Sequence, residues 1–145
     1  MSLVQNKKAY FNYEILEKYE AGIELFGFEV KSLKNSQASL EGAHVAIRGN
    51  EAYVTGMHIS PYQPKNMPND YDPIRNRRLL LTKKEIDKLA GAEGQKGLTI
   101  VPLSVYNKGR KLKIEIAIVR GKKKYDKREV IKKRDTEREV RREIK

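Results

Sequence analysis

The sequence predicts a mainly β protein: a closed antiparallel barrel of about six to seven short strands, with two or three short helices and a basic C-terminal tail. Several short segments alternate apolar and polar residues between turn residues, which is the pattern of half-buried strands. One segment shows helical spacing instead, and a second carries helix start and stop signals. Residues 121–145 hold twelve Lys or Arg but only four aliphatic residues, too few to offset the entropy of ordering that segment.

The first strand is expected after residue 10. Phe11, Tyr13 and Ile15 alternate imperfectly with polar residues. Gly22 interrupts this pattern, as a bulge or a turn would.

The first predicted helix spans residues 27–34. Phe26, Val30 and Leu33 recur at i, i+4 and i+7, which is the spacing of one helix face. Asn35-Ser36 is expected to end the helix, because Asn tolerates the left-handed conformation that often follows a last turn.

Residues 44–60 read as two short strands around a turn at 48–51, since apolar residues alternate on both sides of it. Residues 61–76 contain four of the five prolines. Because proline lacks a backbone N–H donor, this segment is expected to be a long loop.

Residues 77–82 read as a buried strand, and a helix over 83–91 follows. Thr82 can cap this helix together with Glu85, and Gly91 is expected to end it.

Residues 98–106 and 110–120 are predicted to form a hairpin, because the turn sequence Asn107-Lys108-Gly109 separates them. The last strand should present one face to the core and the other to solvent. The positions expected in the core are Leu112, Ile114, Ile116 and Ile118. The positions expected in solvent are Lys113, Glu115 and Ala117.

An OB-type barrel fits this element order, because it is a nucleic-acid-binding architecture that accepts an inserted helix, and because closing a sheet removes its exposed edges. A chain of 145 residues suits one such unit. We expect the barrel over residues 1–124 and the tail over 125–145.

The charge favours a polyanionic partner. Residues 1–120 hold 19 basic and 13 acidic residues and residues 121–145 hold 12 and 6, so each part contributes +6 to the net charge of +12. Nucleic acid is the commonest polyanion in a cell. The alternative is that the charge only keeps the protein in solution.

The composition argues against several other classes. The chain has no Cys, which excludes a disulfide framework and a thiolate metal site. It shows no apolar run of signal-peptide or membrane-span length, so the cytoplasm is the expected compartment. No cofactor motif is present: Gly91–Gly97 lacks the Lys-Ser/Thr order of a phosphate loop and reads as a helix exit and turn.

A nuclease is the enzymatic alternative. His44 and His58 could act with Glu51 or Asp70 in general acid–base chemistry. Such residues are more often ordinary surface positions, so we expect no catalytic and no metal-binding residues.

The tail has good helix propensity but is marginal as an isolated helix, so it is expected to be disordered when free and helical where phosphates neutralise its arginines. Its alternative role is to keep the protein soluble. Tyr125 either stacks on a base or packs on the barrel rim.

An ordered series of motifs resembles the SmpB (small protein B) family, the SsrA/tmRNA-binding proteins, over nearly the whole chain. The motifs are Asn6-Lys7-Lys8-Ala9, Tyr13-x-Ile15, Tyr19-Glu20-Ala21-Gly22-Ile23, Gly27-x-Glu29-Val30-Lys31-Ser32, Met57-His58-Ile59-Ser60-Pro61-Tyr62, Asp72-Pro73-x-Arg75-x-Arg77-x-Leu79-Leu80-Leu81, Glu85-Ile86-x-x-Leu89 and Gly121-Lys122-Lys123-x-Tyr125-Asp126-Lys127-Arg128. The sequence departs from the family at Asn35-Ser36, where a basic-small-Gly turn is commoner, and at His44, where Tyr or Phe is usual.

The resemblance implies a bacterial, non-catalytic, monomeric adaptor of trans-translation. Such a protein binds the tRNA-like domain of transfer-messenger RNA (tmRNA) at its elbow and contacts elongation factor Tu indirectly through the RNA. On a stalled ribosome it replaces the anticodon arm, and its tail enters the decoding centre and the empty mRNA channel. The nascent chain is then tagged and the ribosome is released.

The resemblance also implies site residues. Those expected to bind tmRNA are Asn6, Lys7, Glu20, Arg75, Arg77, Arg78, Leu80 and Lys113. Those expected to face the ribosome are Lys122, Lys123, Lys124, Tyr125, Asp126, Lys127, Arg128, Lys132, Lys133, Arg134, Arg138 and Arg141. Two alternatives stay open: Leu80 as a residue of the barrel core, and Glu20 as a surface residue at a strand end.

A ribosomal or ribosome-assembly protein with an OB barrel and a basic arm is the second functional hypothesis. It would share this composition and bind ribosomal RNA without tmRNA.

Overall fold

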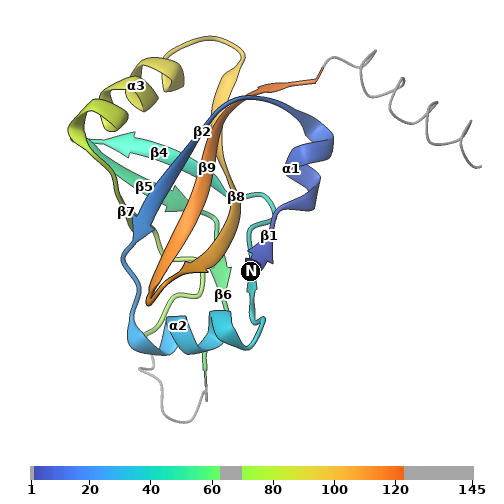
Figure 1. Ribbon diagram of the computed structural model, residues 1–145, viewed down its shortest axis with the longest axis vertical. Helices are drawn as coiled ribbons and strands as arrows, with labels where there is room; N and C mark the ends of the chain where they lie inside the picture. Colours follow the sequence, from blue (N-terminus) through green and yellow to red (C-terminus); the bar gives the residue numbers. More distant parts are fainter. Residues whose placement is uncertain (1, 63–69, 123–145) are drawn as a thin grey trace, which may run out of the picture.

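The computed structural model describes residues 2–62 and 70–122, which form nine strands and three helices (Figure 1). The strands are β1 (Ser2–Gln5), β2 (Tyr13–Ile23), β3 (Ala38–Ser39), β4 (His44–Arg48), β5 (Glu51–Thr55), β6 (His58–Ile59), β7 (Arg77–Leu80), β8 (Leu98–Lys108) and β9 (Lys111–Gly121). The helices are α1 (Lys7–Asn12), α2 (Gly27–Lys34) and α3 (Lys83–Glu93). The tail over 125–145, and its predicted disorder and helix, lie outside the described residues.

Seven strands form one antiparallel sheet in the order β1-β8-β9-β2-β7-β5-β4, and β3 pairs with β6 separately. The sheet curls until β4, at one edge, lies against β8. Within the described ranges, however, no hydrogen-bonded ladder joins β4 to β8 or to β1. The mainly β, antiparallel prediction is therefore confirmed, whereas the prediction of a closed barrel is wrong.

Both facing strands have features that disfavour a regular ladder between them. The backbone N–H of Ile47 in β4 donates to the Glu93 carboxylate of α3 (2.8 Å), which also pairs with Arg48 (3.2 Å). In β8, Pro102 has no N–H to donate, and the register shifts between Pro102 and Ser104. A side chain of α3 thus takes a place that a neighbouring strand would take in a closed barrel.

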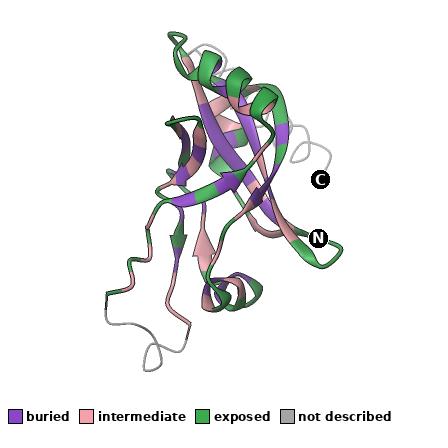
Figure 2. Cartoon of the chain, turned by 90° about the vertical axis from the view of Figure 1, so that its left-hand side faces the viewer, coloured by how far each residue is buried: buried purple, intermediate pink, exposed green. Residues whose placement is uncertain are grey.

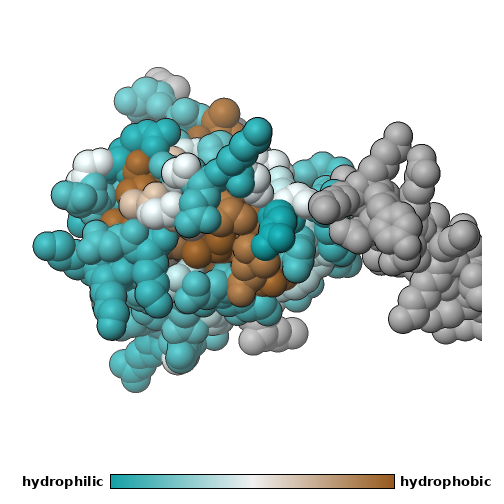
Figure 3. All heavy atoms as spheres, turned by 90° about the horizontal axis from the view of Figure 1, so that it is seen from above, coloured by the Kyte–Doolittle hydropathy of each residue, from teal (hydrophilic) through white to brown (hydrophobic). Residues whose placement is uncertain are grey.

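The main core lies on the inner side of the curled sheet. Leu33 of α2 and Leu89 of α3 enter it with Ile100, Ile114 and Ile116 of the final hairpin. In Figure 1, α3 covers one end of the sheet and α2 the other. Figure 2 shows buried residues along the strands and exposed ones on the loops and on α3. Seen from the α3 end, a small hydrophobic area is surrounded by hydrophilic residues (Figure 3).

A second, smaller core lies on the other side of the sheet, under α1. Ala9 of α1 packs there on Val101 and Leu103 of β8 and on Ala117 and Val119 of β9. The sequence prediction that Ala117 faces solvent is therefore wrong. The pattern of β9 alone could not show that a short helix, which was not predicted, covers this end of the strand.

Several local predictions are confirmed. Helix α2 spans residues 27–34 and ends at Asn35-Ser36 as expected, although Ser36 (φ 59°) and not Asn35 (φ −98°) adopts the left-handed conformation. The β4–β5 hairpin turns at Gly49 and Asn50, whose φ angles of 57° and 64° are those of the turn type that best suits two-residue hairpins. The β8–β9 hairpin also forms as predicted, but its turn lies at Gly109 (φ 64°) and Arg110 and not over residues 107–109.

Two local predictions are wrong. The irregularity in β2 lies between Ile15 and Glu17, not at Gly22, which stays in register with its neighbours. Helix α3 runs through Gly91 to Glu93, although its capping box at the N-terminus is as expected. An interior glycine costs only about 1 kcal/mol, and the buried Ala92 beside it holds the last turn against the core. No helix in the described part of the chain is long and apolar enough to span a membrane.

Candidate RNA-binding surface

On the side of the sheet turned away from the main core, α1 covers one end of β9 and leaves uncovered β7 and the parts of β2, β9 and β8 nearer the β8–β9 hairpin. We call this surface the outer face. Strand register places Gly22 between Leu80 and Lys113, and Lys113 beside Tyr106. The outer face is formed by Lys18, Glu20, Gly22, Leu80, Tyr106, Lys108, Lys113 and Glu115. It brings together three of the predicted RNA-binding residues: Glu20, Leu80 and Lys113.

Glu20 lies in a hydrogen-bonded cluster on the outer face. The Tyr106 hydroxyl donates to its Oε2 atom (2.6 Å), and Lys108 Nζ donates to its Oε1 atom (2.9 Å). The bond from Tyr106, and then that from Lys108, holds the pKa of Glu20 below its ordinary value. Burial, and then the bond to Glu20, raises the pKa of Tyr106. Glu20 is therefore an ionised acceptor with fixed neighbours, and not simply a charge at a strand end.

Leu80 is 49% exposed, so it is not a residue of the barrel core. Its side chain lies over Gly22, where an added Cβ would be 3.1 Å from the Leu80 Cβ. Leu80 and Lys113 line the same groove. The outer face thus offers an apolar surface next to a cation, which suits contact with an unpaired base and its phosphate.

Arg78 lies beside this surface on β7. Its guanidinium is 3.5 Å from a Glu24 carboxylate oxygen and 3.4 Å from one of Glu51, and the side chain is 44% exposed. Arg78 is therefore accessible to RNA, although two carboxylates already share its charge.

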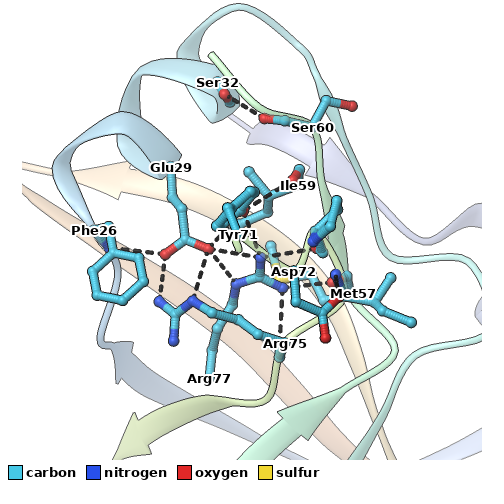
Figure 4. A network of polar contacts seen from close by, with 12 residues as sticks. Phe26, Glu29, Ser32, Met57, Ile59, Ser60, Tyr71, Asp72, Arg75 and Arg77 are labelled. Carbon is cyan, nitrogen blue, oxygen red and sulfur yellow. Dashed lines mark hydrogen bonds and ion pairs between the residues drawn. The ribbon is translucent and has the colours of Figure 1, made fainter. Parts of the chain in front are cut away.

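Arg77 is fully buried, and this corrects the expectation that it contacts RNA. Its Nε and Nη2 atoms donate to the Glu29 carboxylate (2.8 and 2.7 Å), and its other N–H groups donate to the carbonyls of Met57 and Pro73 (Figure 4). Because its N–H groups already donate to acceptors within the protein and its side chain has no exposed surface, Arg77 joins α2 to β7 and cannot contact RNA directly.

Arg75 completes this network from its edge. Its guanidinium donates to both oxygens of the buried Glu29 and lies 4.0 Å from the ring centroid of Phe26. Burial raises the pKa of Glu29, but the hydrogen bonds from Arg75, the Phe26 backbone N–H and Arg77 together hold that pKa below its ordinary value. The Arg75 side chain is 25% exposed, so its charge is directed mainly to Glu29.

Asn6 also has a structural position. Its Oδ1 atom accepts from the Ala9 N–H at the start of α1 (3.2 Å), and its Nδ2 atom donates to the carbonyls of Leu40 (3.3 Å) and Pro102 (3.0 Å). It is 7% exposed, and β8, β9 and β2 separate it from Leu80 of β7 in the sheet order. Lys7 beside it is exposed.

Lys122 is the last described residue, and it is tied to α1. Its backbone N–H donates to the Asn12 carbonyl (3.0 Å) and its Nζ atom to the Tyr10 carbonyl (3.2 Å). The other residues predicted to face the ribosome, from Lys123 to Arg141, lie outside the described part of the chain.

The two histidines lie on different sheets. The ring of His44, at the start of β4, contacts the Thr55 hydroxyl, and His58 is exposed on β6. Among residues 2–62 and 70–122, no group of three or more His, Cys, Asp or Glu is placed to hold a metal ion.

The sequence reasoning missed Gly22, Tyr106 and Lys108 as members of this surface. The predicted turn over residues 107–109 would have placed Tyr106 opposite Arg110, whereas the observed turn at Gly109 and Arg110 places Tyr106 opposite Lys113 and Lys108 opposite Lys111. The error in the predicted register therefore hid both residues. Gly22 gave no signal either, because its role depends on Leu80, 58 positions away in the sequence.

The chain is similar to known proteins over nearly its whole length. The family described as "SmpB protein" matches residues 3–145. An SsrA-binding protein of Clostridium acetobutylicum is 49% identical over 144 residues, which cover 99% of this chain and 92% of that protein. One from Elusimicrobium minutum is 53% identical over 140 residues, covering 97% and 88%. A solved structure described as "tmRNA-SmpB: a journey to the center of the bacterial ribosome" contains a chain that is 43% identical, with a TM-score of 0.69 over 83% of this chain and 84% of that one.

Proposed function

This chain belongs to the SmpB family, and we propose that it is the RNA-binding adaptor of trans-translation, a protein without catalytic activity of its own. It binds the tRNA-like domain of tmRNA at the elbow and brings it to stalled ribosomes in the cytoplasm, where the nascent chain is tagged and the ribosome is freed. Elongation factor Tu reaches the complex through the RNA. The relatives are SsrA-binding proteins, and the structural relative is described with tmRNA and the bacterial ribosome.

The observation that carries this proposal is the position of Leu80 on the outer face. An aliphatic side chain that is half exposed beside Lys113 and the ionised Glu20 provides three kinds of contact to RNA: apolar, cationic and acceptor. Unpaired, unstacked nucleotides of a folded RNA need all three, whereas a regular duplex presents mainly phosphates and 2′-hydroxyls.

The direction of β9 supports a division of roles along the molecule. Lys113 lies near the start of β9 and Gly121 at its end, roughly 25 Å away at about 3.3 Å per residue. Residues 1–124 would hold the RNA elbow at the first end. The described chain reaches Lys122 at the second end, beside α1, and the tail over 125–145 would serve the decoding centre and the mRNA channel.

A gel-shift comparison tests the proposal. The full-length protein should bind the tRNA-like domain of tmRNA far more tightly than a duplex of equal length at physiological salt. Equal affinity for the two RNAs would contradict it. Co-purification of stoichiometric ribosomal RNA without tmRNA would instead favour a ribosomal or assembly protein.

A further inference from the structure

Asn6 lies where three parts of the fold meet: the end of β1, the start of α1 and the two facing strands β4 and β8. Its backbone N–H donates to the Leu103 carbonyl of β8 (2.8 Å). Its Nδ2 atom donates to the Pro102 carbonyl of β8 (3.0 Å) and to the Leu40 carbonyl ahead of β4 (3.3 Å). Its Oδ1 atom accepts from the Ala9 N–H. Both polar atoms of this buried side chain therefore have partners within the protein.

Helix α1 depends on these bonds, because it is too short to be stable alone. It has six residues, whereas isolated helices shorter than about 12–15 residues are marginal in water. Its first turn has no acidic residue and its last turn no basic one to complement the helix dipole. The N-cap bond from Asn6 and the packing of Ala9 on β8 and β9 hold the helix to the sheet instead. The position of α1 therefore follows that of Asn6.

The other end of α1 binds Lys122. The Lys122 backbone N–H donates to the Asn12 carbonyl (3.0 Å), and its Nζ atom donates to the Tyr10 carbonyl (3.2 Å). Both carbonyls belong to the last turn, where a helix leaves its carbonyls without intrahelical partners and where its dipole favours a cation. Residues 123–145 join the described body at Lys122, so α1 connects this junction to Asn6.

We propose that Asn6 is a positioning residue: it fixes α1 on the sheet, and through α1 it fixes the junction with residues 123–145, without contacting RNA itself. The inference rests on the proposed function, in which those residues act on the ribosome after the outer face has bound tmRNA. It gives Asn6 a role other than the tmRNA contact that the family resemblance implies. Loss of Asn6 should therefore impair the ribosomal step and leave the binding of free RNA intact.

Substitution of Asn6 in the full-length protein separates the two steps. Asn6→Ala should bind the tRNA-like domain of tmRNA within about twofold of the wild type, but tag nascent chains on stalled ribosomes about tenfold less well. Asn6→Ser, whose hydroxyl can still cap α1 but cannot reach both carbonyls, should lie between the two and guards against a folding failure of the alanine variant.

Hydrogen exchange measured by NMR supplies a local readout that a general loss of stability would not reproduce. The Lys122 amide is bonded to the Asn12 carbonyl, so it should exchange about tenfold faster in Asn6→Ala, while amides in the middle of β9 keep their protection. Val54→Ala is the matched control for stability, because Val54 is buried in the main core and not in the core under α1. It should keep the Lys122 protection, the RNA affinity and the tagging of the wild type.

Three results would overturn the role of Asn6 and leave the proposed function standing. One is a loss of RNA affinity in Asn6→Ala as large as that in Glu20→Gln, which would place Asn6 in the RNA site. The others are unchanged exchange at Lys122, and faster exchange there with normal tagging. If the wild type itself did not prefer this RNA to a duplex, the proposed function would fail, and the exchange at Lys122 would still decide whether Asn6 fixes α1.

Discussion

Glu29 and Arg77 form a fully buried ion pair, with 2.7 and 2.8 Å between the guanidinium and carboxylate atoms, that joins α2 to β7. Neither side chain has exposed surface, so water cannot replace either partner. Arg75 and the Tyr71 hydroxyl complete the shell around the carboxylate. The pair therefore holds the end of the sheet nearest the groove in one arrangement.

Loss of Arg77 should destabilise the fold. Arg77→Met leaves the Glu29 carboxylate buried with only part of its shell, and removal of one partner from a buried pair costs about 3–5 kcal/mol. Urea denaturation should show this loss in the free energy of unfolding. Arg78→Met is the matched control, because the half-exposed pairs of Arg78 with Glu24 and Glu51 are each worth only about 0–1 kcal/mol. Equal losses for the two variants would contradict the buried role of Arg77.

The same pair predicts a dependence of stability on acid pH. The pKa of Glu29 is lowered in the folded protein, against about 4.3 for an unperturbed Glu in the unfolded chain. The ionised carboxylate therefore contributes stability above that value, and the contribution is lost as the pH falls through the lowered pKa. The difference in unfolding free energy between wild type and Glu29→Gln should be largest near pH 7 and shrink below about pH 4. Parallel stability curves from pH 7 to 3 would exclude this source of acid sensitivity.

The sequence predicted helices and hairpins correctly where the information lay within a short segment. Residues 27–34 were predicted as a helix from three apolar positions, and the β4–β5 hairpin from alternation around a turn. It did not reveal that Arg77 is buried, because its partner Glu29 lies 48 positions away and the Arg75-to-Leu80 motif reads as a basic RNA contact. The open edge of the sheet depends likewise on Glu93 and Ile47, 46 positions apart.

Helix α1 shows the same limit on a smaller scale. Six residues with mixed polarity give no clear period. The helix forms because Asn6 caps it while bonding to two carbonyls from elsewhere in the chain, and because Ala9 packs on β8 and β9. Of the candidate RNA-binding surface, resemblance indicated Glu20, Leu80 and Lys113, but only strand register shows that they share one face.

Neutralising Glu20 should weaken RNA binding without unfolding the protein. Its carboxylate is exposed and holds Tyr106 and Lys108 in place, so Glu20→Gln removes an acceptor and releases a cation. Affinity for the tRNA-like domain of tmRNA should fall by about tenfold, as for loss of one charge-assisted contact. Tyr106→Phe should give a smaller loss in the same direction. Glu17→Gln, on the same strand and also exposed, should bind as the wild type does.

Leu79 and Leu80 are neighbours with opposite roles. Leu79 is 2% exposed and lies in the main core, so Leu79→Ala should cost about 2–5 kcal/mol of stability. Leu80 is 49% exposed, and Leu80→Ala should cost less than about 1 kcal/mol. Its effect should appear in RNA affinity, measured on protein shown to be folded by thermal unfolding. If Leu80→Ala caused a large loss of stability and left the RNA affinity unchanged, Leu80 would be a core residue and not an RNA contact.

Truncation separates the body from the tail, and the structure indicates where to cut. Lys122 bonds to the carbonyls of Asn12 and Tyr10, so a chain ending at Lys122 keeps the attachment of β9 to α1. That variant should keep the melting temperature and the RNA affinity of the full chain, since Glu20, Leu80 and Lys113 are intact. It should nevertheless fail to support tagging of nascent chains on stalled ribosomes, because it lacks all the residues expected to face the ribosome except Lys122.

A chain ending at Arg120 is the informative comparison, because it also lacks the two bonds to α1 and should melt at a lower temperature. Loss of RNA binding and tagging together in the chain ending at Lys122 would mean that the tail, and not the outer face, provides the main grip on the RNA.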